Sequence, residues 1–192
     1  MTNAKNTVRP FIANRRSPRA FDRDLSVDSE ILSSLLEAAR WAPSANNIQP
    51  WRFIVGQKGD ATHKKIASTL SEGNRIWAEH APLLILNVTQ EVGERGKQSY
   101  AWHDLGLATT QMILQASSME LYTHVMAGFS KDEARSAFDI PIEYMPLTVI
   151  AIGYLGDASN LPEKLQKREN APRLRKPLEE ITFQNTWGES LA

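Results

Sequence analysis

Three arginines and a serine near the start of the chain have the chemistry to hold a phosphate. They lie in the segment Arg15-Arg16-Ser17-Pro18-Arg19, where the proline restricts the backbone. A guanidinium group is a planar fork of donors that matches phosphate oxygens, and each charge-assisted hydrogen bond contributes roughly 1.5–3 kcal/mol. The alternative is a solvated basic segment that Asp22 and Asp24 neutralise locally. Composition alone leaves both interpretations open.

A second group of cations lies near the other end of the chain. Arg173, Arg175 and Lys176 are part of the segment Ala171–Pro177. An exposed basic tail explains this segment equally well. If the two basic segments meet in space, however, they form a single site for a dianion such as a phosphate. Spacing along the sequence does not decide whether they meet.

An amide-rich turn lies between two tryptophans, Trp41 and Trp51. Its polar residues stand between two prolines, in the order Pro43, Ser44, Asn46, Asn47, Gln49, Pro50. Asn and Gln side chains match the alternating donors and acceptors on the edge of a heteroaromatic ring, and the tryptophans suggest the walls of a partly apolar pocket. The alternative is that these side chains bond locally within a turn. We favour a binding role.

Two shorter features are ambiguous by themselves. Gly128, after Ala127, would let backbone N–H groups approach a ligand atom closely, although a plain turn glycine is the better interpretation without context. The pair His103-Asp104 could transfer protons, but we favour a structural polar pair on a long apolar helix. The sequence has no cysteine, no GxGxxG, GxxxxGK[ST] or GxSxG motif, and its four histidines lie too far apart for the common zinc motifs.

The composition is that of a single globular domain over residues 1–192. Hydrophobic residues make up 42% and charged residues 23%, and 22 Lys and Arg balance 22 Asp and Glu. Since nucleic-acid binders carry a basic excess, the zero net charge argues against such a partner. The apolar stretches are too short to cross a bilayer, and the first residues lack the apolar segment of a secretory signal. We therefore expect a cytoplasmic protein with no membrane partner.

Apolar periodicity predicts the elements that must position these residues. Expected helices are Asp28–Trp41, capped by Ser26, then Asp60–Leu70, Tyr100–Glu120, and a helix from Ser130 to Phe138. Expected strands are Arg52–Val55, Leu83–Thr89, Leu121–Met126 and Leu147–Tyr154. The polar segment Asp157–Pro172 is expected to be a long loop. Because strands and helices mix without a strict βαβ rhythm, we predict an α+β fold.

The expected helix Tyr100–Glu120 is apolar over more than one side. Leu105, Met112 and Ala116 form one stripe, whereas Leu107 and Leu114 lie on other faces. This pattern is typical of a helix in the middle of a core or in a subunit interface.

In their order along the chain, these motifs resemble the nitroreductase family of flavoproteins. Arg15–Phe21 resembles the family's N-terminal signature, and Glu37–Trp51 resembles its most distinctive segment. The remaining motifs follow as Gly73-Asn74, Asp104-x-Gly106, Gly128-Phe129, Gly153-Tyr154 and Arg173-x-Arg175-x-Pro177. The resemblance thus covers residues 15–177, most of the chain.

The resemblance implies a central, mainly antiparallel sheet flanked by helices, in an intertwined homodimer with FMN at the subunit interface. The residues implied to hold the FMN phosphate are Arg15, Arg16, Ser17, Arg173 and Arg175. Arg19 would lie near the pyrimidine end of the flavin, where a cation stabilises the negative charge of the reduced ring.

Other flavin contacts implied by the resemblance come from three further segments. Asn74 would bond the polar edge of the ring, and the backbone of Ala127 and Gly128 would approach the flavin N5. The partner subunit would contribute Pro43, Ser44, Asn46 and Gln49. Some family members carry an acidic residue where this chain has Ala127, so a side-chain contact from that position is lost.

The activity implied is a hydride transfer from NADH or NADPH through FMN to a small electron-poor acceptor, such as a nitroaromatic or a quinone. The flavin carries the bond chemistry, so no catalytic side chain is expected. One alternative is an FMN enzyme of the same fold with another reaction, such as desaturation or flavin reduction. Another is a non-catalytic protein that binds a phosphorylated ligand.

Overall fold

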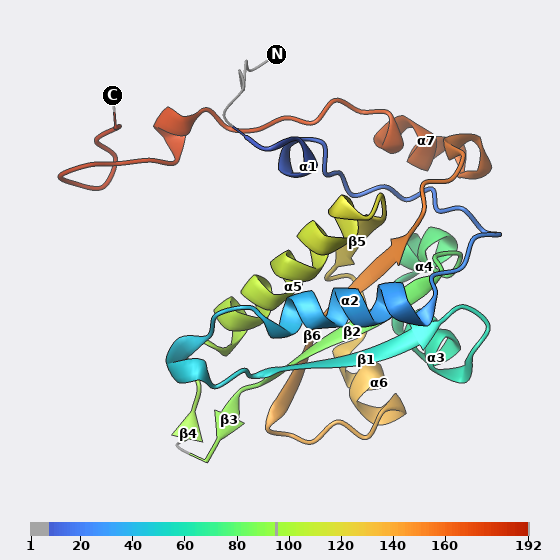
Figure 1. Cartoon of the computed structure of the whole chain (residues 1–192), viewed down its shortest axis with the longest axis horizontal. Helices are drawn as coiled ribbons and strands as arrows, with labels where there is room; N and C mark the ends of the chain where they lie inside the picture. The colour runs from blue at the N-terminus through green and yellow to red at the C-terminus, as the bar shows by residue number, and fades with distance from the viewer. Residues whose placement is uncertain (1–7, 95, 192) are drawn as a thin grey trace.

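A four-stranded antiparallel sheet forms the centre of the fold (Figure 1). The computed structural model describes residues 8–94 and 96–191, and the sheet has the strand order β1-β2-β6-β5. The strands are β1 (Trp51–Gln57), β2 (Leu83–Gln90), β5 (Tyr122–Met126) and β6 (Tyr144–Gly153), and a small separate hairpin joins β3 (Val92–Gly93) to β4 (Gly96–Lys97). Neighbouring strands of the sheet are antiparallel. The predicted α+β fold with a mainly antiparallel sheet is therefore confirmed.

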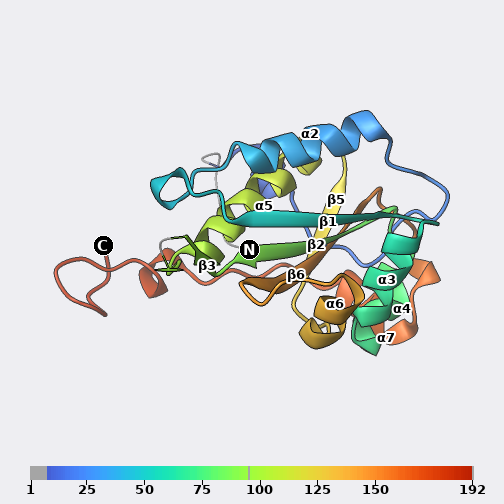
Figure 2. The same cartoon turned by 90° about the horizontal axis from the view of Figure 1, so that it is seen from below.

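Helices cover both faces of this sheet (Figure 2). One face carries α2 (Ser29–Arg40) and α5 (Ala101–Ser118), and the other carries α3 (Ala61–Thr69), α4 (Glu72–Ala78), α6 (Lys131–Ala137) and α7 (Glu163–Glu169). Strand β2 is buried on both sides, which explains the apolar run Leu83–Leu86 with which it begins. Since successive side chains alternate between faces, Leu83 and Ile85 pack with α2 and α5, whereas Leu84 and Leu86 pack on the opposite side.

Side-chain caps explain where α2, α3 and α6 begin. Helix α3 begins after Asp60, whose carboxylate accepts a hydrogen bond from the His63 N–H, and α6 begins after Ser130, whose hydroxyl accepts one from the Glu133 N–H. The expected cap of α2 is wrong. Asp28, not Ser26, caps this helix, because its carboxylate lies three residues before Ile31 and accepts that residue's N–H at 2.7 Å.

The segment Asp157–Pro172, expected to be a long loop, contains two helices. These are the 3-10 helix η2 (Ala158–Asn160) and α7. Leu161 and Leu165 are four residues apart and both are buried against the core, so they supply the apolar side of this short helical segment. Two apolar residues among many charged ones give too weak a periodic pattern for prediction. Helices α4 and α1 (Pro10–Ala13) were also missed.

Helix α5 lies on the surface of the single chain and packs on one side. Leu105 and Met112 are buried against the sheet and α2, but Leu107, Ile113 and Leu114 are only partly covered. A core position for the whole helix is therefore wrong within one chain. Burial of its outer side in a subunit interface stays a prediction.

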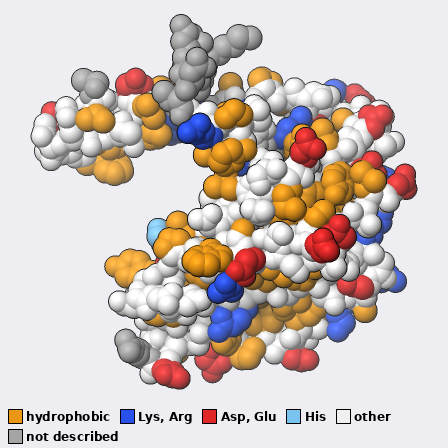
Figure 3. All heavy atoms as spheres, in the orientation of Figure 1, with side chains coloured by type: hydrophobic (Ala, Val, Ile, Leu, Met, Phe, Trp, Pro, Cys, Tyr) orange, Lys and Arg blue, Asp and Glu red, His pale blue; other side chains and the backbone are white. Residues whose placement is uncertain are grey.

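The two ends of the chain run side by side across α5 (Figure 1). The Ser117 hydroxyl of α5 donates to the Phe11 carbonyl oxygen in α1 at 2.9 Å. After α7, the chain passes back over α1 and continues as an arm, residues 171–191, that includes the 3-10 helix η3 (Leu178–Glu180). Figure 3 shows this C-terminal arm projecting from the body, with hydrophobic side chains on its surface. Its Trp187 is 92% exposed.

Candidate functional site

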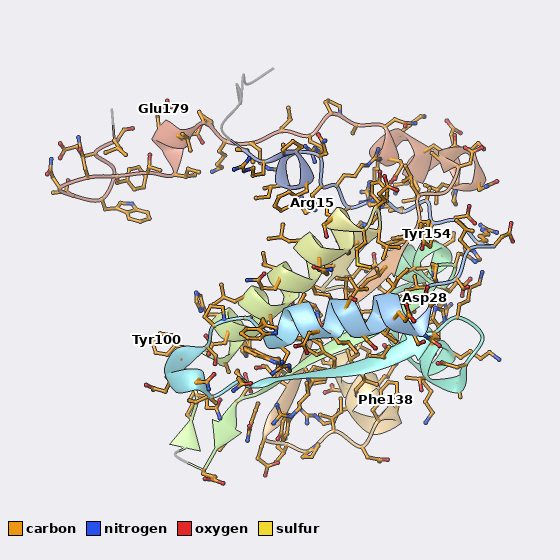
Figure 4. All side chains as sticks on the ribbon, viewed as in Figure 1. Arg15, Asp28, Tyr100, Phe138, Tyr154 and Glu179 are labelled. Carbon is orange, nitrogen blue, oxygen red and sulfur yellow. The ribbon has the colours of Figure 1, made fainter. Side chains whose placement is uncertain are left out.

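The two basic segments meet at Arg15 (Figure 4). The Arg173 guanidinium donates to the carbonyl oxygens of Arg15 and Ala13. Arg15 in turn donates to the Ser17 hydroxyl at 3.3 Å. Arg175 also lies close enough for its positive charge to lower the pKa of Arg15. The structure thus brings together Arg15, Ser17, Arg173 and Arg175 from opposite ends of the chain, which sequence spacing could not decide.

Like charges are concentrated in this arginine cluster, which we define as Arg15, Arg173 and Arg175. Burial of the Arg15 guanidinium, together with the positive charges of Arg173 and Arg175, lowers the pKa of Arg15. Within the described part of the chain, none of the three forms an ion pair with an acidic side chain. A hollow of about 470 Å³ adjoins the cluster and is lined by Arg15, Tyr122 and Tyr154 among others. These donors fit the phosphate group of FMN, because a dianion would offset their mutual repulsion.

Arg16 and Arg19 have a different partner, the buried carboxylate of Glu169. Arg16 Nη2 donates to Glu169 Oε1 at 3.1 Å, and the Arg19 backbone N–H donates to Oε2 at 2.9 Å. The Arg19 guanidinium lies 3.8 Å from the same oxygen. These two arginines therefore share one acidic partner within the chain, whereas those of the arginine cluster have none among the described residues. Glu169 was not among the predicted site residues, because it lies 150 residues from Arg19 and no local pattern marks it.

Asn74 and Gly128 come together on the opposite side of the sheet from α5. Asn74 Nδ2 donates to the Gly128 carbonyl oxygen at 3.0 Å, and the Ser71 N–H donates to the same oxygen at 3.0 Å. A Cβ on Gly128 would lie 2.6 Å from Asn74 Nδ2, so a side chain at this position would displace the Asn74 amide. The backbone N–H groups of Ala127 and Gly128 donate to no acceptor among residues 8–94 and 96–191. Both residues are exposed, so these N–H groups have no protein acceptor to give up if they bind a ligand atom.

The amide-rich loop, Pro43–Gln49, has an unusual backbone. Its 3-10 helix η1 (Ala45–Asn47) includes Asn46, and the positive φ angles are 51° at Asn46, 57° at Asn47 and 52° at Gln49. Three such angles in non-glycine residues are costly, and such strain is concentrated at functional sites. The Ser44 hydroxyl accepts the Gln49 N–H at 3.0 Å, which closes the loop.

The sequence suggested that the two tryptophans form the walls of a pocket. Within one chain this prediction is wrong. Trp51 is buried in the core with α2 and α5. Trp41 is 74% exposed, and its ring N–H donates to Glu37. Near the loop there is instead a hollow of about 580 Å³, lined by Asn46, Lys97 and Tyr100 among others.

Asp104 of α5 anchors the amide-rich loop. Its buried carboxylate accepts the Ala45 N–H at 3.0 Å, and His103 Nδ1 lies 3.3 Å from its other oxygen. The structural interpretation of His103-Asp104 is thus supported, although the tie to Ala45 was not foreseen. Within one chain, the loop lies near Tyr100 and away from Arg15 (Figure 4). Among residues 8–94 and 96–191, no hydrogen bond or ion pair joins the loop to the arginine cluster.

The described part of the chain has neither a candidate membrane-spanning helix nor a candidate metal-binding cluster. No helix there is both long and apolar enough to cross a membrane. Among residues 8–94 and 96–191, no group of three or more His, Cys, Asp or Glu side chains is arranged to hold a metal ion.

A family model and sequence relatives both link this chain to known proteins. The Nitroreductase family model matches residues 12–76 and 60–154. A 15.4 kDa protein of Mycolicibacterium smegmatis is 36% identical over 148 residues, covering 73% of this chain and 99% of its own length. A protein of Streptococcus pyogenes named "Putative NAD(P)H nitroreductase" is 24% identical over 193 residues, covering 82% of this chain and 90% of its own.

Solved structures agree with this likeness. The crystal structure of an oxidoreductase containing FMN has a TM-score of 0.91 and 33% identity, and the match covers 97% of this chain and 96% of that one. A nitroreductase family protein of Clostridium difficile has a TM-score of 0.72 and 27% identity, with 92% and 96% covered. The chain belongs to the nitroreductase family. Its fold is the nitroreductase fold, as the resemblance implied.

Proposed function

We propose that the protein is an FMN-dependent oxidoreductase that passes a hydride from NADH or NADPH to an electron-poor small molecule, such as a nitroaromatic or a quinone. The observation that carries this proposal is the convergence of Arg15, Arg173 and Arg175 without an acidic partner among the described residues. A phosphate dianion would satisfy their donors and reduce their repulsion. The likeness to an oxidoreductase containing FMN supports FMN as the molecule that brings this phosphate.

The chain's own residues would bind and orient the cofactor. The Ser17 hydroxyl adds a donor beside Arg15, and the Oδ1 of Asn74 is available as an acceptor at the polar edge of the ring. The exposed N–H groups of Ala127 and Gly128 would point donors at the ring nitrogen that takes up hydride. Bound FMN supplies the redox chemistry, accepting a hydride from the reduced nicotinamide and delivering it to the acceptor.

A homodimer would complete this site. The amide-rich loop and the arginine cluster do not meet within one chain, so we propose that Pro43, Ser44, Asn46 and Gln49 serve the flavin bound by a second copy. The C-terminal arm supports the dimer, because it extends from the body with its apolar side chains exposed: Leu174, Leu178, Ile181, Trp187 and Leu191. A monomer would leave this apolar surface in water. Sedimentation equilibrium at low micromolar concentration should give twice the chain mass of 21.5 kDa. A stable holo-monomer would contradict the shared site.

The visible spectrum of the purified protein tests the proposed activity. We expect bound flavin that loses its colour when NADH or NADPH is added without oxygen, and regains it when a nitroaromatic or a quinone follows. Reoxidation by neither acceptor would favour another reaction of the same fold. Protein that binds a phosphorylated ligand but takes up no FMN would contradict the proposal.

A further inference from the structure

The carboxylate of Glu169 joins the two ends of the chain beside the arginine cluster. Its side chain is 3% exposed, and both of its oxygens have partners: Oε1 accepts from Arg16 Nη2 at 3.1 Å, and Oε2 accepts from the Arg19 N–H at 2.9 Å. Arg16 Nη2 also donates to the Glu169 carbonyl oxygen at 3.0 Å. Buried Glu169 therefore holds the segment Arg16–Arg19 at two points, the Arg16 side chain and the Arg19 backbone.

The position of Glu169 is unfavourable for its own helix. It is the last residue of α7, where the helix dipole favours cations and opposes a carboxylate. Burial adds a desolvation cost that is offset only while Arg16 and Arg19 remain paired with it. The presence of Glu169 is thus better explained by its contacts with Arg16 and Arg19 than by a contribution to the stability of α7.

The segments that Glu169 connects are the two halves of the proposed phosphate site. Ser17 lies between the two residues that bond to Glu169, and Arg15 directly precedes them. On the other side, the chain runs from Glu169 to Arg173 in four residues. Arg173 and Arg15 repel each other electrostatically, although Arg173 donates to the Arg15 and Ala13 carbonyl oxygens. The Glu169 contacts add a second restraint on the two segments that neutralises neither Arg15 nor Arg173.

From this geometry we propose that Glu169 is a positioning residue of the phosphate site, a role that rests on the proposed binding of FMN. It holds Arg15 and Ser17 opposite Arg173 and Arg175 by pairing with Arg16 and the backbone of Arg19. Because its charge is matched by Arg16 and Arg19, it leaves the arginine cluster positive. In this account Arg16 acts through Glu169 and does not contact the phosphate independently.

The test compares FMN with riboflavin, which has the same ring and lacks the phosphate. Apoprotein is titrated with each flavin, and flavin fluorescence gives the dissociation constant. For Glu169→Gln we expect FMN affinity to fall roughly tenfold, because a charge-assisted contact is lost, with riboflavin affinity changed less than about twofold. The matched control is Glu163→Gln in the same helix, an exposed residue paired with Lys167 at 2.8 Å. It should leave both affinities as in the wild type.

A double-mutant cycle keeps the test decisive. Arg16→Met should cause the same phosphate-specific loss, and it carries the test alone if Glu169→Gln does not fold. The double variant should lose little more FMN affinity than either single variant, since both substitutions remove the same Arg16–Glu169 ion pair. Four results would each overturn the proposal. These are unchanged FMN affinity in the variants, equal losses of affinity for FMN and riboflavin, a matching loss in Glu163→Gln, and additive losses in the double-mutant cycle. Wild-type protein that binds neither flavin would instead overturn the proposed function.

Discussion

The Asp104 carboxylate accepts a hydrogen bond from the Ala45 backbone N–H at 3.0 Å, so helix α5 holds the start of the amide-rich loop. The loop contains three residues with positive φ, and each costs on the order of 1 kcal/mol in a non-glycine residue. Such a backbone persists only where its surroundings impose it. Asp104 is one of the contacts that do so, together with the bond from the Gln49 N–H to the Ser44 hydroxyl.

Replacing Asp104 should therefore affect the flavin through the loop. For Asp104→Ala, we expect FMN affinity in the dimer to fall by up to roughly 10- to 150-fold, since a hydrogen bond to a charged group contributes about 1.5–3 kcal/mol. Asp104→Asn keeps an acceptor oxygen and should recover most of the loss. Fluorescence titration with FMN measures both variants. Wild-type affinity in the alanine variant would mean that the loop does not serve the cofactor.

Two substitutions of Asn46 separate its side chain from its backbone. Asn46→Gly removes the amide but suits the observed φ of 51°, whereas Asn46→Ala also strains the backbone by about 1 kcal/mol. If the amide bonds a flavin across the interface, both variants should lose roughly 5- to 150-fold in FMN affinity or rate of flavin reduction. If the residue merely shapes a turn, the glycine variant should keep normal flavin binding and turnover. Titration, stopped-flow reduction and the unfolding midpoint, measured on both preparations, decide between these roles.

Gly128→Ala should displace the Asn74 side chain. The new Cβ would lie 2.6 Å from Asn74 Nδ2 and 3.0 Å from Ser71 Oγ, and both of these side-chain ends can move. We expect Asn74 to lose its hydrogen bond to the Gly128 carbonyl oxygen, with a loss of about 0.5–1.5 kcal/mol in the free energy of unfolding. The control is Gly73→Ala in α4, where a Cβ meets nothing within 4 Å. That variant should be as stable as the wild type or up to about 1 kcal/mol more stable. Urea unfolding of the apoproteins measures both changes, and equal stability of the two variants would contradict the packing argument.

Partly buried His124 should make the fold less stable in acid. Burial lowers the pKa of His124. The hydrogen bond that its Nδ1 donates to the Pro18 carbonyl oxygen at 2.9 Å raises the pKa and only partly offsets burial. The charge of Arg19 lowers the pKa further, and that of Glu169 raises it. The unfolded chain therefore binds the proton more readily, so stability is present above the ordinary histidine pKa of about 6.5 and is lost as the pH falls below it.

The slope of stability against pH measures this effect. Urea unfolding from pH 7.5 to 5 should show a smaller slope for His124→Gln than for the wild type. The slope that remains includes His63, whose pKa burial also lowers. A wild-type slope in the His124→Gln variant would show that His124 is not the group responsible.

Much of the fold was predictable because its signals are local. The apolar run Leu83–Thr89 gave β2, and Asp60 and Ser130 marked the starts of α3 and α6. The cap of α2 was misplaced because Ser26 and Asp28 are both good caps. Helix α7 was missed because it is held by two leucines and by packing against distant residues.

The site was predictable in its residue types but not in its pairings. The positions of Arg15 and Arg173 suggested a shared phosphate site, and contact between them required the folded chain. The partners Glu169 and Asp104 act on residues 150 and 59 positions away, at separations where no periodic or motif signal exists. The resemblance placed Arg16 and Arg19 on the cofactor, whereas in the structure their charges meet Glu169.

Flavin binding by arginine variants tests the central claim most directly. The dissociation constants of FMN and riboflavin are measured for the wild type, Arg15→Ala, Arg175→Ala and the control Lys64→Ala, which removes an exposed cation from α3 on the other face of the sheet. We predict that the two arginine variants lose roughly tenfold or more in FMN affinity, that added salt weakens FMN binding further, and that riboflavin affinity hardly changes. Lys64→Ala should match the wild type. Full FMN occupancy and unchanged FMN affinity in both arginine variants would contradict a phosphate site built from the two ends of the chain.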